Sequence, residues 1–135
     1  MTRQLNNSLL FFSRVLFVVL FLPAGIGKVT DFGGTVAYIT SAGVPLASLN
    51  AVIALVVEIV CSIAILVGFR VRLAAMILAF FTVMASVLFH PYWAVPADQA
   101  YVTQLLFFKN MAIVGGLFAL AAHGPGNWSL AARTQ

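Results

Sequence analysis

Apolar residues are gathered into four long runs along the chain, separated by shorter polar segments. The runs cover approximately residues 9–28, 46–67, 71–90 and 102–122. A helix of roughly 20 residues, rising about 1.5 Å per residue, crosses a hydrocarbon core of about 30 Å. Because lipid offers no hydrogen-bond partner to an open backbone, each run is predicted to be a transmembrane helix.

The connection between the second and third runs is a tight turn at residues 68–70, which predicts that these two helices are antiparallel neighbours. The connection between the first and second runs is longer. Within it Phe32, Val36 and Ile39 recur at helical spacing, after a candidate cap at Thr30 or Asp31. This spacing predicts a short amphipathic helix that lies at the outward-facing surface of the membrane.

The predicted fold is therefore all-α: a single domain, residues 1–135, that forms an integral membrane four-helix bundle with a short interfacial helix between helices one and two. Composition supports this fold, since 63% of the residues are hydrophobic, 7% are charged, and the mean hydropathy is +1.10. A soluble domain carries about 25% charged residues to cover its surface. Most of the surface is thus expected to face the lipid bilayer.

The net charge of +4 does not indicate nucleic-acid binding, because the seven Lys and Arg residues are scattered. Cys61 is the only cysteine, which excludes an intrachain disulfide, a redox-active cysteine pair and a thiolate metal cluster. His90 and His123 are predicted at opposite membrane faces, and the chain has no Glu-x-x-His motif. We therefore expect no haem or metal held within one chain, and no cofactor of its own.

Basic residues concentrate in the cytoplasmic flanks and short loops of membrane proteins. If all four runs cross, the two termini and the second connection share one side, which carries Arg3, Arg70, Arg72 and Arg133. Arg14 is expected to extend its side chain toward that side. Asp31, Asp98 and, at the boundary, Lys28 lie on the other side. This distribution predicts that both termini are cytoplasmic. We expect the first run to be retained, since Arg14 interrupts it and no clear cleavage pattern follows.

Two ionisable residues fall within the predicted spans, where a charge costs at least about 2.5 kcal/mol and is a functional candidate by default. Glu58 lies about 12 residues into the second span, roughly 18 Å from its outer end at about 1.5 Å per residue. Lys109 lies about seven residues into the fourth, roughly 10 Å from the outer surface. We predict that they form a buried ion pair or bind one polar ligand. The alternative is a pair that only fixes helix packing, a purpose that Asn110 could also serve.

Lys28 and His90 end the first and third spans on the same outer side as Lys109. The predicted ligand-binding residues are therefore Glu58, Lys109, Lys28, His90 and Asn110, around a cavity that opens outward, with Tyr92 and Trp93 at its wall. An interfacial histidine beside Pro91 is the alternative for His90. No catalytic residue and no metal ligand is predicted. Small residues allow membrane helices to approach closely, and this role is predicted for Gly25, Gly27, Gly115 and Gly116.

The chain resembles the DoxX family of small bacterial inner-membrane proteins over nearly its whole length. Motifs in their order and spacing carry the likeness: Gly27-Lys28 with Asp31-Phe32, Gly43-Val44-Pro45, Glu58, Gly68-Phe69-Arg70-Val71-Arg72, Phe89-His90, Phe108-Lys109-Asn110, Gly115-Gly116, and Gly124-Pro125-Gly126 with Ser129. The resemblance implies a four-helix bundle in the cytoplasmic membrane of a bacterium. It also implies, from some relatives, a membrane subunit of quinone-linked or redox-stress assemblies.

Three functional hypotheses remain open at this stage. The first is an accessory membrane subunit of a redox system, without catalytic activity of its own, whose outward polar cavity takes a quinone and whose partner is a soluble or membrane redox protein. The second is a carrier or channel for a small solute that acts as a homo-oligomer. It is ranked lower, because Ser62 and Thr82 are among the few polar residues on the cytoplasmic side of Glu58. The third is a membrane scaffold without a ligand.

Overall fold

The computed structural model describes residues 2–132, and every regular element within that range is a helix. Four of these helices are long and apolar enough to cross a membrane, so the all-α fold with four spans is confirmed. The elements are α1 (Arg3–Thr30), α2 (Phe32–Ser41), α3 (Ala47–Val67), α4 (Val71–Phe89), α5 (Ala97–His123) and the short 3₁₀ helix η1 (Leu130–Ala132). Arg133, which entered the orientation argument, lies outside the described residues.

Two helices extend beyond the apolar runs that predicted them. α1 begins at Arg3 rather than at residue 9, because Thr2 caps it by accepting the N–H of Leu5. α5 begins at Ala97 rather than at residue 102, and Asp98 in its first turn complements the positive end of the helix dipole. Hydropathy marks only the part of a helix that lies in lipid, so these polar turns were missed.

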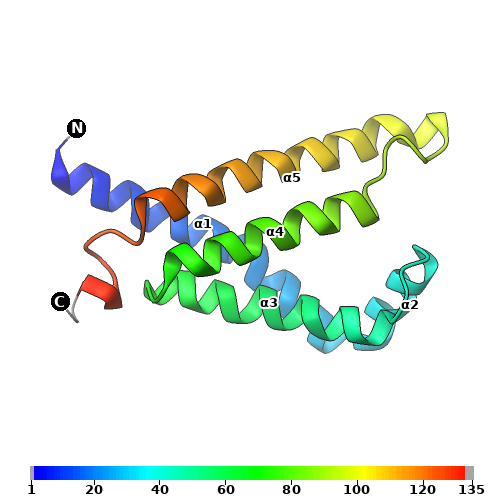
Figure 1. Ribbon diagram of the computed structural model, residues 1–135, viewed down its shortest axis with the longest axis horizontal. Helices are drawn as coiled ribbons and strands as arrows, with labels where there is room; N and C mark the ends of the chain where they lie inside the picture. Colours follow the sequence, from blue (N-terminus) through cyan, green and yellow to red (C-terminus); the bar gives the residue numbers. More distant parts are fainter. Residues whose placement is uncertain (1, 133–135) are drawn as a thin grey trace.

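The four long helices pack side by side in the order α1, α3, α4, α5. α1 packs against α3, α3 against α4 and α4 against α5, whereas α1 and α5 barely touch (Figure 1). The predicted antiparallel pairing of α3 and α4 is confirmed by the turn at Gly68, whose φ of 79° suits glycine. The predicted interfacial helix is α2, which Asp31 caps and which packs on α3. The C-terminal end of α1 and the N-terminal end of α5 therefore stand apart.

The tightly packed core lies in the half of the bundle that contains the α3–α4 turn. Its fully buried members include Ile65, Ala75, Leu78, Ala79 and Leu117. Large apolar side chains on the outside of the same helices are exposed and face lipid, as a membrane bundle requires. The small alanines of α4 allow its neighbours to approach closely in this half.

Arg14 lies inside this packed half, and its side chain is only 1% exposed. It donates to the carbonyl oxygens of Ile65 and Leu66 at 3.5 and 3.4 Å, and also to that of Trp128. As expected, it extends toward the end of the bundle that carries the α3–α4 turn, but it is buried there by protein. The last carbonyls of a helix carry partial negative charge, so those of α3 attract the guanidinium, although that of Ile65 also accepts the N–H of Gly68 at 3.2 Å.

The four glycines that were predicted to allow close helix contact differ in whether a neighbouring helix lies against them. A Cβ on Gly25 would lie 2.7 Å from Cγ1 of Ile59 and 3.1 Å from Cβ of Glu58, and one on Gly116 would lie 3.0 Å from Cζ of Phe17. The predicted role in close helix contact is confirmed for these two. The prediction is wrong for Gly27 and Gly115. A Cβ on either residue would meet no atom within 4 Å, because it would point away from the neighbouring helices.

Gly25 and Gly27 thus form a matched pair within α1. Gly25→Ala should destabilise the fold by about 1–3 kcal/mol, because the added methyl group pushes α3 away. Gly27→Ala should be neutral or stabilise by up to about 1 kcal/mol through helix propensity. Thermal unfolding in detergent, followed by circular dichroism, measures both. Equal melting temperatures for the two variants would contradict the close contact at Gly25.

Removing the guanidinium of Arg14 should destabilise the same end of the molecule. Arg14→Met leaves the carbonyls of Leu66 and Trp128 without this donor, which should cost about 2 kcal/mol and release the C-terminal segment. Melting temperature and limited proteolysis of the C-terminus report these effects. Arg3→Met removes a charge at an exposed position and serves as the control. A C-terminus that stays protected in Arg14→Met would argue against the proposed anchoring.

Candidate functional site

Glu58 forms an ion pair with Lys28, not with Lys109. The lysine Nζ lies 2.8 Å from Oε2 and 3.0 Å from Oε1, and the side chain of Glu58 is 7% exposed. The prediction of a Glu58–Lys109 pair was wrong because it compared depth alone. α3, which carries Glu58, packs directly on α1, and the close approach at Gly25 brings Lys28 within reach, whereas α5 packs on α4.

A cavity of about 460 Å³ lies beside this ion pair, between α1, α2 and the parts of α3 and α4 that lie away from the α3–α4 turn. Most of its wall is apolar, with contributions from α3 and α4 such as Ile53, Phe80 and Met84. Its polar lining consists of Lys28, Thr35, Tyr38, Asn50, Glu58 and His90. Three of the five predicted site residues, Lys28, Glu58 and His90, are therefore brought together around one space.

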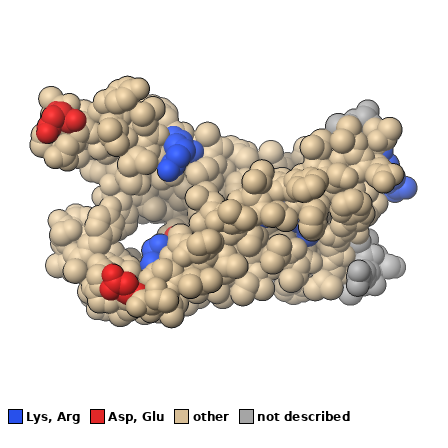
Figure 2. Space-filling view, turned by 180° about the vertical axis from the view of Figure 1, so that it is seen from behind, with Lys and Arg blue, Asp and Glu red and all other residues tan. Residues whose placement is uncertain are grey.

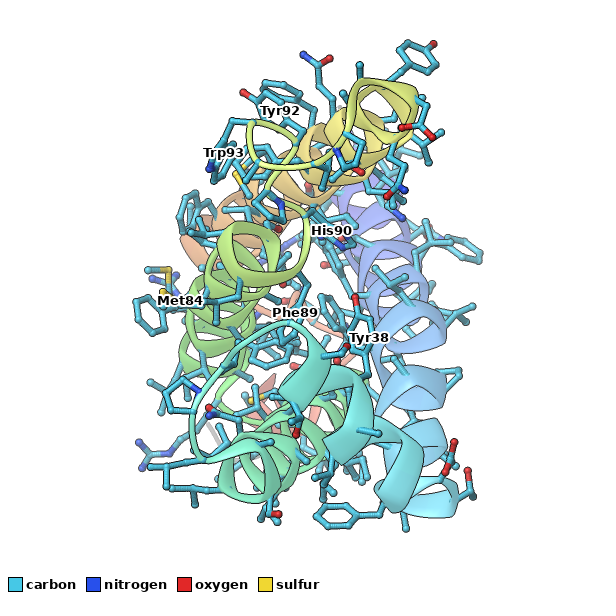
Figure 3. All side chains as sticks on the ribbon, turned by 90° about the vertical axis from the view of Figure 1, so that its right-hand side faces the viewer. Tyr38, Met84, Phe89, His90, Tyr92 and Trp93 are labelled. Carbon is cyan, nitrogen blue, oxygen red and sulfur yellow. The ribbon has the colours of Figure 1, made fainter. Side chains whose placement is uncertain are left out.

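The cavity is covered by α2. The ring of Tyr38 on α2 stacks on that of Phe89 on α4, with 5.3 Å between the ring centres. Figure 3, which looks along the bundle from this end, shows Tyr38, Phe89 and His90 turned toward the space between the helices. Tyr92 and Trp93 lie instead on the outer side of the α4–α5 connection, in an aromatic cluster with Phe107. They were expected at the cavity wall, but they do not line it.

His90 directly follows α4, and its backbone N–H donates to the carbonyl of Ser86 at 2.9 Å. Burial and, to a lesser degree, the nearby charge of Lys109 lower the pKa of its imidazole. The ring is therefore neutral at pH 7 and offers one N–H donor and one nitrogen acceptor to the cavity. Lys109 is exposed on α5 and does not line the cavity itself.

Asn110 joins α5 to α4. Its Nδ2 donates to the hydroxyl of Ser86 at 3.0 Å, and that hydroxyl donates to the carbonyl of Thr82 at 2.6 Å. Asn110 lies outside the cavity lining, so the structure uses it for helix packing, the alternative that the sequence had left open.

Below Glu58 the bundle is closed. On α3 the cavity lining runs from Asn50 to Glu58 and no further, and the packed core follows. Ser62 and Thr82 are buried away from the cavity, and the hydroxyl of Thr82 donates to the carbonyl of Leu78 within its own helix. The cavity is thus a blind pocket in the described part of the chain.

The sequence missed Thr35, Tyr38 and Asn50, which line the cavity. The site residues were predicted mainly from ionisable side chains, and these three side chains are uncharged. A signal was present, because Thr35 and Tyr38 are three residues apart and thus lie on one face of α2. What the pattern could not show is that this face folds back over the ends of α3 and α4.

A model of the DoxX family matches residues 9–91 of the chain. The matched segment contains every residue of the cavity lining, from Lys28 to His90, whereas Lys109 and Asn110 lie beyond it. The chain belongs to the DoxX family. The predicted membership is therefore confirmed.

Two relatives of Escherichia coli (strain K12) match almost end to end. This DoxX-family chain is 38% identical to inner membrane protein YphA over 90% of its own length and 87% of the relative's. It is 38% identical to inner membrane protein YqjF over 95% and 93% of the two lengths. A shorter match, 31% identical over 68 residues, is to the Surfeit locus protein 4 homolog of Schizosaccharomyces pombe, of which it covers 22%. No solved structure matches.

With its four apolar helices, the chain is a multi-pass inner-membrane protein. Within residues 2–132 the ion pair at Glu58 is the only one between side chains. In a membrane, removal of one partner leaves a buried charge without compensation, which costs about 3–5 kcal/mol.

A double-mutant cycle should therefore show that Glu58 is coupled to Lys28. Glu58→Gln and Lys28→Met should each destabilise the protein, and the double variant should lose less than the sum, with a coupling of about 1–3 kcal/mol. The matched cycle of Glu58→Gln with Lys109→Met should give a coupling near zero. Unfolding in detergent measures both cycles. Coupling to Lys109 rather than to Lys28 would overturn the observed pairing.

Proposed function

We propose that this protein is an accessory membrane subunit of a redox system and that its cavity binds a quinone head group. The observation that carries the proposal is the blind pocket of about 460 Å³, with apolar walls and a few converging polar groups. Ligand sites in proteins typically have volumes of about 300–1,000 Å³ and this mixture of surfaces. A quinone combines a flat apolar ring with two carbonyl acceptors, which suits such a pocket.

His90 is the best-placed donor to a quinone carbonyl, because its neutral ring lines the pocket and can offer one N–H. Lys28 already donates to both oxygens of Glu58 and to the carbonyl of Ala24, the last at 3.3 Å. The long bond to Ala24 is the one that a ligand carbonyl could replace. Glu58 then holds Lys28 in position.

A redox partner protein is part of this proposal. Cys61 is the only cysteine, so the chain has no cysteine pair that could cycle between dithiol and disulfide. In the proposed assembly, electrons pass to or from the bound quinone through a soluble or membrane partner, and this chain holds the quinone at the membrane. Its contribution is binding and orientation rather than catalysis.

The proposed orientation places both termini in the cytoplasm and the pocket on the outer side. The acidic side chains lie at the pocket end of the molecule, whereas basic side chains lie both beside the hollow at that end and at the opposite end (Figure 2). Arg70 and Arg72 flank the α3–α4 turn at that opposite end. The enrichment of Lys and Arg on the cytoplasmic side supports this direction.

The closed floor of the pocket disfavours the alternative of a solute carrier or channel. Passage would need a second polar opening below Glu58, where the described residues form the packed core instead. A site that is open at one end suits a bound ligand better than a transported one.

Quinone binding is expected to depend on the pocket. His90→Leu should weaken binding of a short-tailed benzoquinone about tenfold, the effect of one hydrogen bond lost in an apolar setting. Ala54→Leu should have a similar effect by filling space, since Ala54 lines the pocket. Ala37→Leu, on the exposed face of α2, is the matched control. Titration of the detergent-solubilised protein, with bound and free quinone separated by dialysis, measures the affinity. Binding that is equal in all three variants would refute the site.

A further inference from the structure

Lys109 is exposed in the middle of a membrane helix. It is the thirteenth of the 27 residues of α5. At about 1.5 Å per residue the helix is about 40 Å long, whereas a hydrocarbon core is about 30 Å thick, so the middle of α5 lies within the lipid. Among the described residues, no carboxylate lies within ion-pair distance of the lysine Nζ. A charge at this depth is costly unless another group compensates it.

The face of α5 that carries Lys109 is the one that turns toward α1. Gly116 marks this face, because a Cβ on it would lie 3.0 Å from Cζ of Phe17 on α1. Residues three or four positions apart share a helix face, so Ala112, Lys109 and Leu105 continue it away from that contact. All three are exposed. This part of the face therefore has no neighbouring helix.

The helices α1 and α5 diverge from this contact and leave a groove between them. They barely touch, and Figure 2 shows the hollow between the two arms of the molecule at this end. Of the most apolar stretch of α5, 17% is buried, compared with 39% for α4. In a closed four-helix bundle the first and last helices cover this side of each other. The α1–α5 groove, whose α5 wall consists of Leu105, Lys109 and Ala112, is instead left open to the membrane.

Lipid does not supply what this groove lacks. Acyl chains carry no charge, and phosphate groups lie at the membrane surface. Even when residues 97–101 stand outside the lipid, Lys109 is roughly 10 Å below that surface at about 1.5 Å per residue. An apolar groove with one cation in its wall fits a transmembrane helix that carries one carboxylate, because opposite charges attract strongly where water does not screen them.

A second copy of this chain has no suitable carboxylate in its spans. Glu58 is already paired with Lys28, and Asp31 caps α2 at the end of α1. Asp98 lies eleven residues before Lys109, so copies inserted in the same direction present it roughly 16 Å from the depth of Lys109 at about 1.5 Å per residue. Charge complementarity therefore favours a different protein as the occupant.

We propose that the α1–α5 groove binds a transmembrane helix of a different protein, and that one Asp or Glu in the middle of that helix pairs with Lys109. The bound helix supplies the counter-charge that the chain lacks and closes the open side of the bundle. This inference goes beyond the proposed function, since it assigns a protein-binding surface outside the pocket. It holds whether or not the pocket binds a quinone, because Lys109 does not line the pocket.

Two synthetic transmembrane peptides test the proposal. Both are leucine–alanine helices of about 20 residues with a dansyl label, identical except for one central Glu or Gln. Energy transfer from the tryptophans of the full-length protein to the label measures binding in lipid vesicles. The wild-type protein should bind the Glu peptide about tenfold more tightly than the Gln peptide, the effect of one charged hydrogen bond. Lys109→Met should abolish this preference, while Lys109→Arg should keep most of it.

Two further variants locate the binding surface. Ala112→Leu should weaken both peptides about tenfold, because it fills the groove without changing charge. Ala122→Leu, at an exposed position near the C-terminal end of the same helix, is the matched control and should bind as the wild type does. Unchanged binding in Ala112→Leu would contradict the groove as the site.

Equal affinities for the two peptides in the wild type would leave Lys109 to the lipid head groups and would overturn the charge pair. A preference for the Glu peptide that survives Lys109→Met would do the same. Self-association of the protein without peptide, lost in Lys109→Met, would assign the groove to a second copy and would also overturn the proposal. Neither peptide contains a quinone, so failure here is distinct from failure of quinone binding.

Discussion

The contact between α1 and α3 at Gly25 and Glu58 determines most of what this molecule can do. A carboxylate buried in a membrane bundle must have a counter-charge, and Lys28 supplies it only because the two helices approach without a side chain between them. The same contact fixes the outer end of α1 beside α3. The cavity is the space enclosed between that end of α1, α2 and α4. The position of the ion pair in its wall and the shape of the cavity therefore both depend on the contact between α1 and α3.

Much of the architecture was legible in the sequence because the membrane imposes it. Long apolar runs can only be helices in lipid, and the turn at Gly68 could be located from its length and its glycine. The cap of α2 at Asp31 was also among the residues proposed for it. These features depend on local sequence and on the solvent, not on which helices become neighbours.

The incorrect predictions concern which residues become neighbours in the folded chain. Lys109 was predicted to pair with Glu58, whereas Lys28 was predicted only to line the same cavity, and the depth of a residue in its span cannot identify its partner. Only the packing of α3 on α1 decides that Lys28 is the partner. For the same reason, the burial of Arg14 was not predicted, since the carbonyls that hold it come from α3 and from the C-terminal segment. Whether the pocket residues bind a ligand stays a prediction.

The unequal packing of the two halves has a mechanical consequence. Near the α3–α4 turn, small side chains interlock and Arg14 ties α1 to α3 and to the C-terminal segment. At the other end, α5 has few partners besides α4, and a single stacked ring pair joins α2 to the end of α4. Local openings cost least where few contacts must break. The half of the bundle near the α3–α4 turn should therefore be rigid, and the opposite half should be flexible. Motions of the flexible half can widen or narrow the pocket without disturbing the packed core.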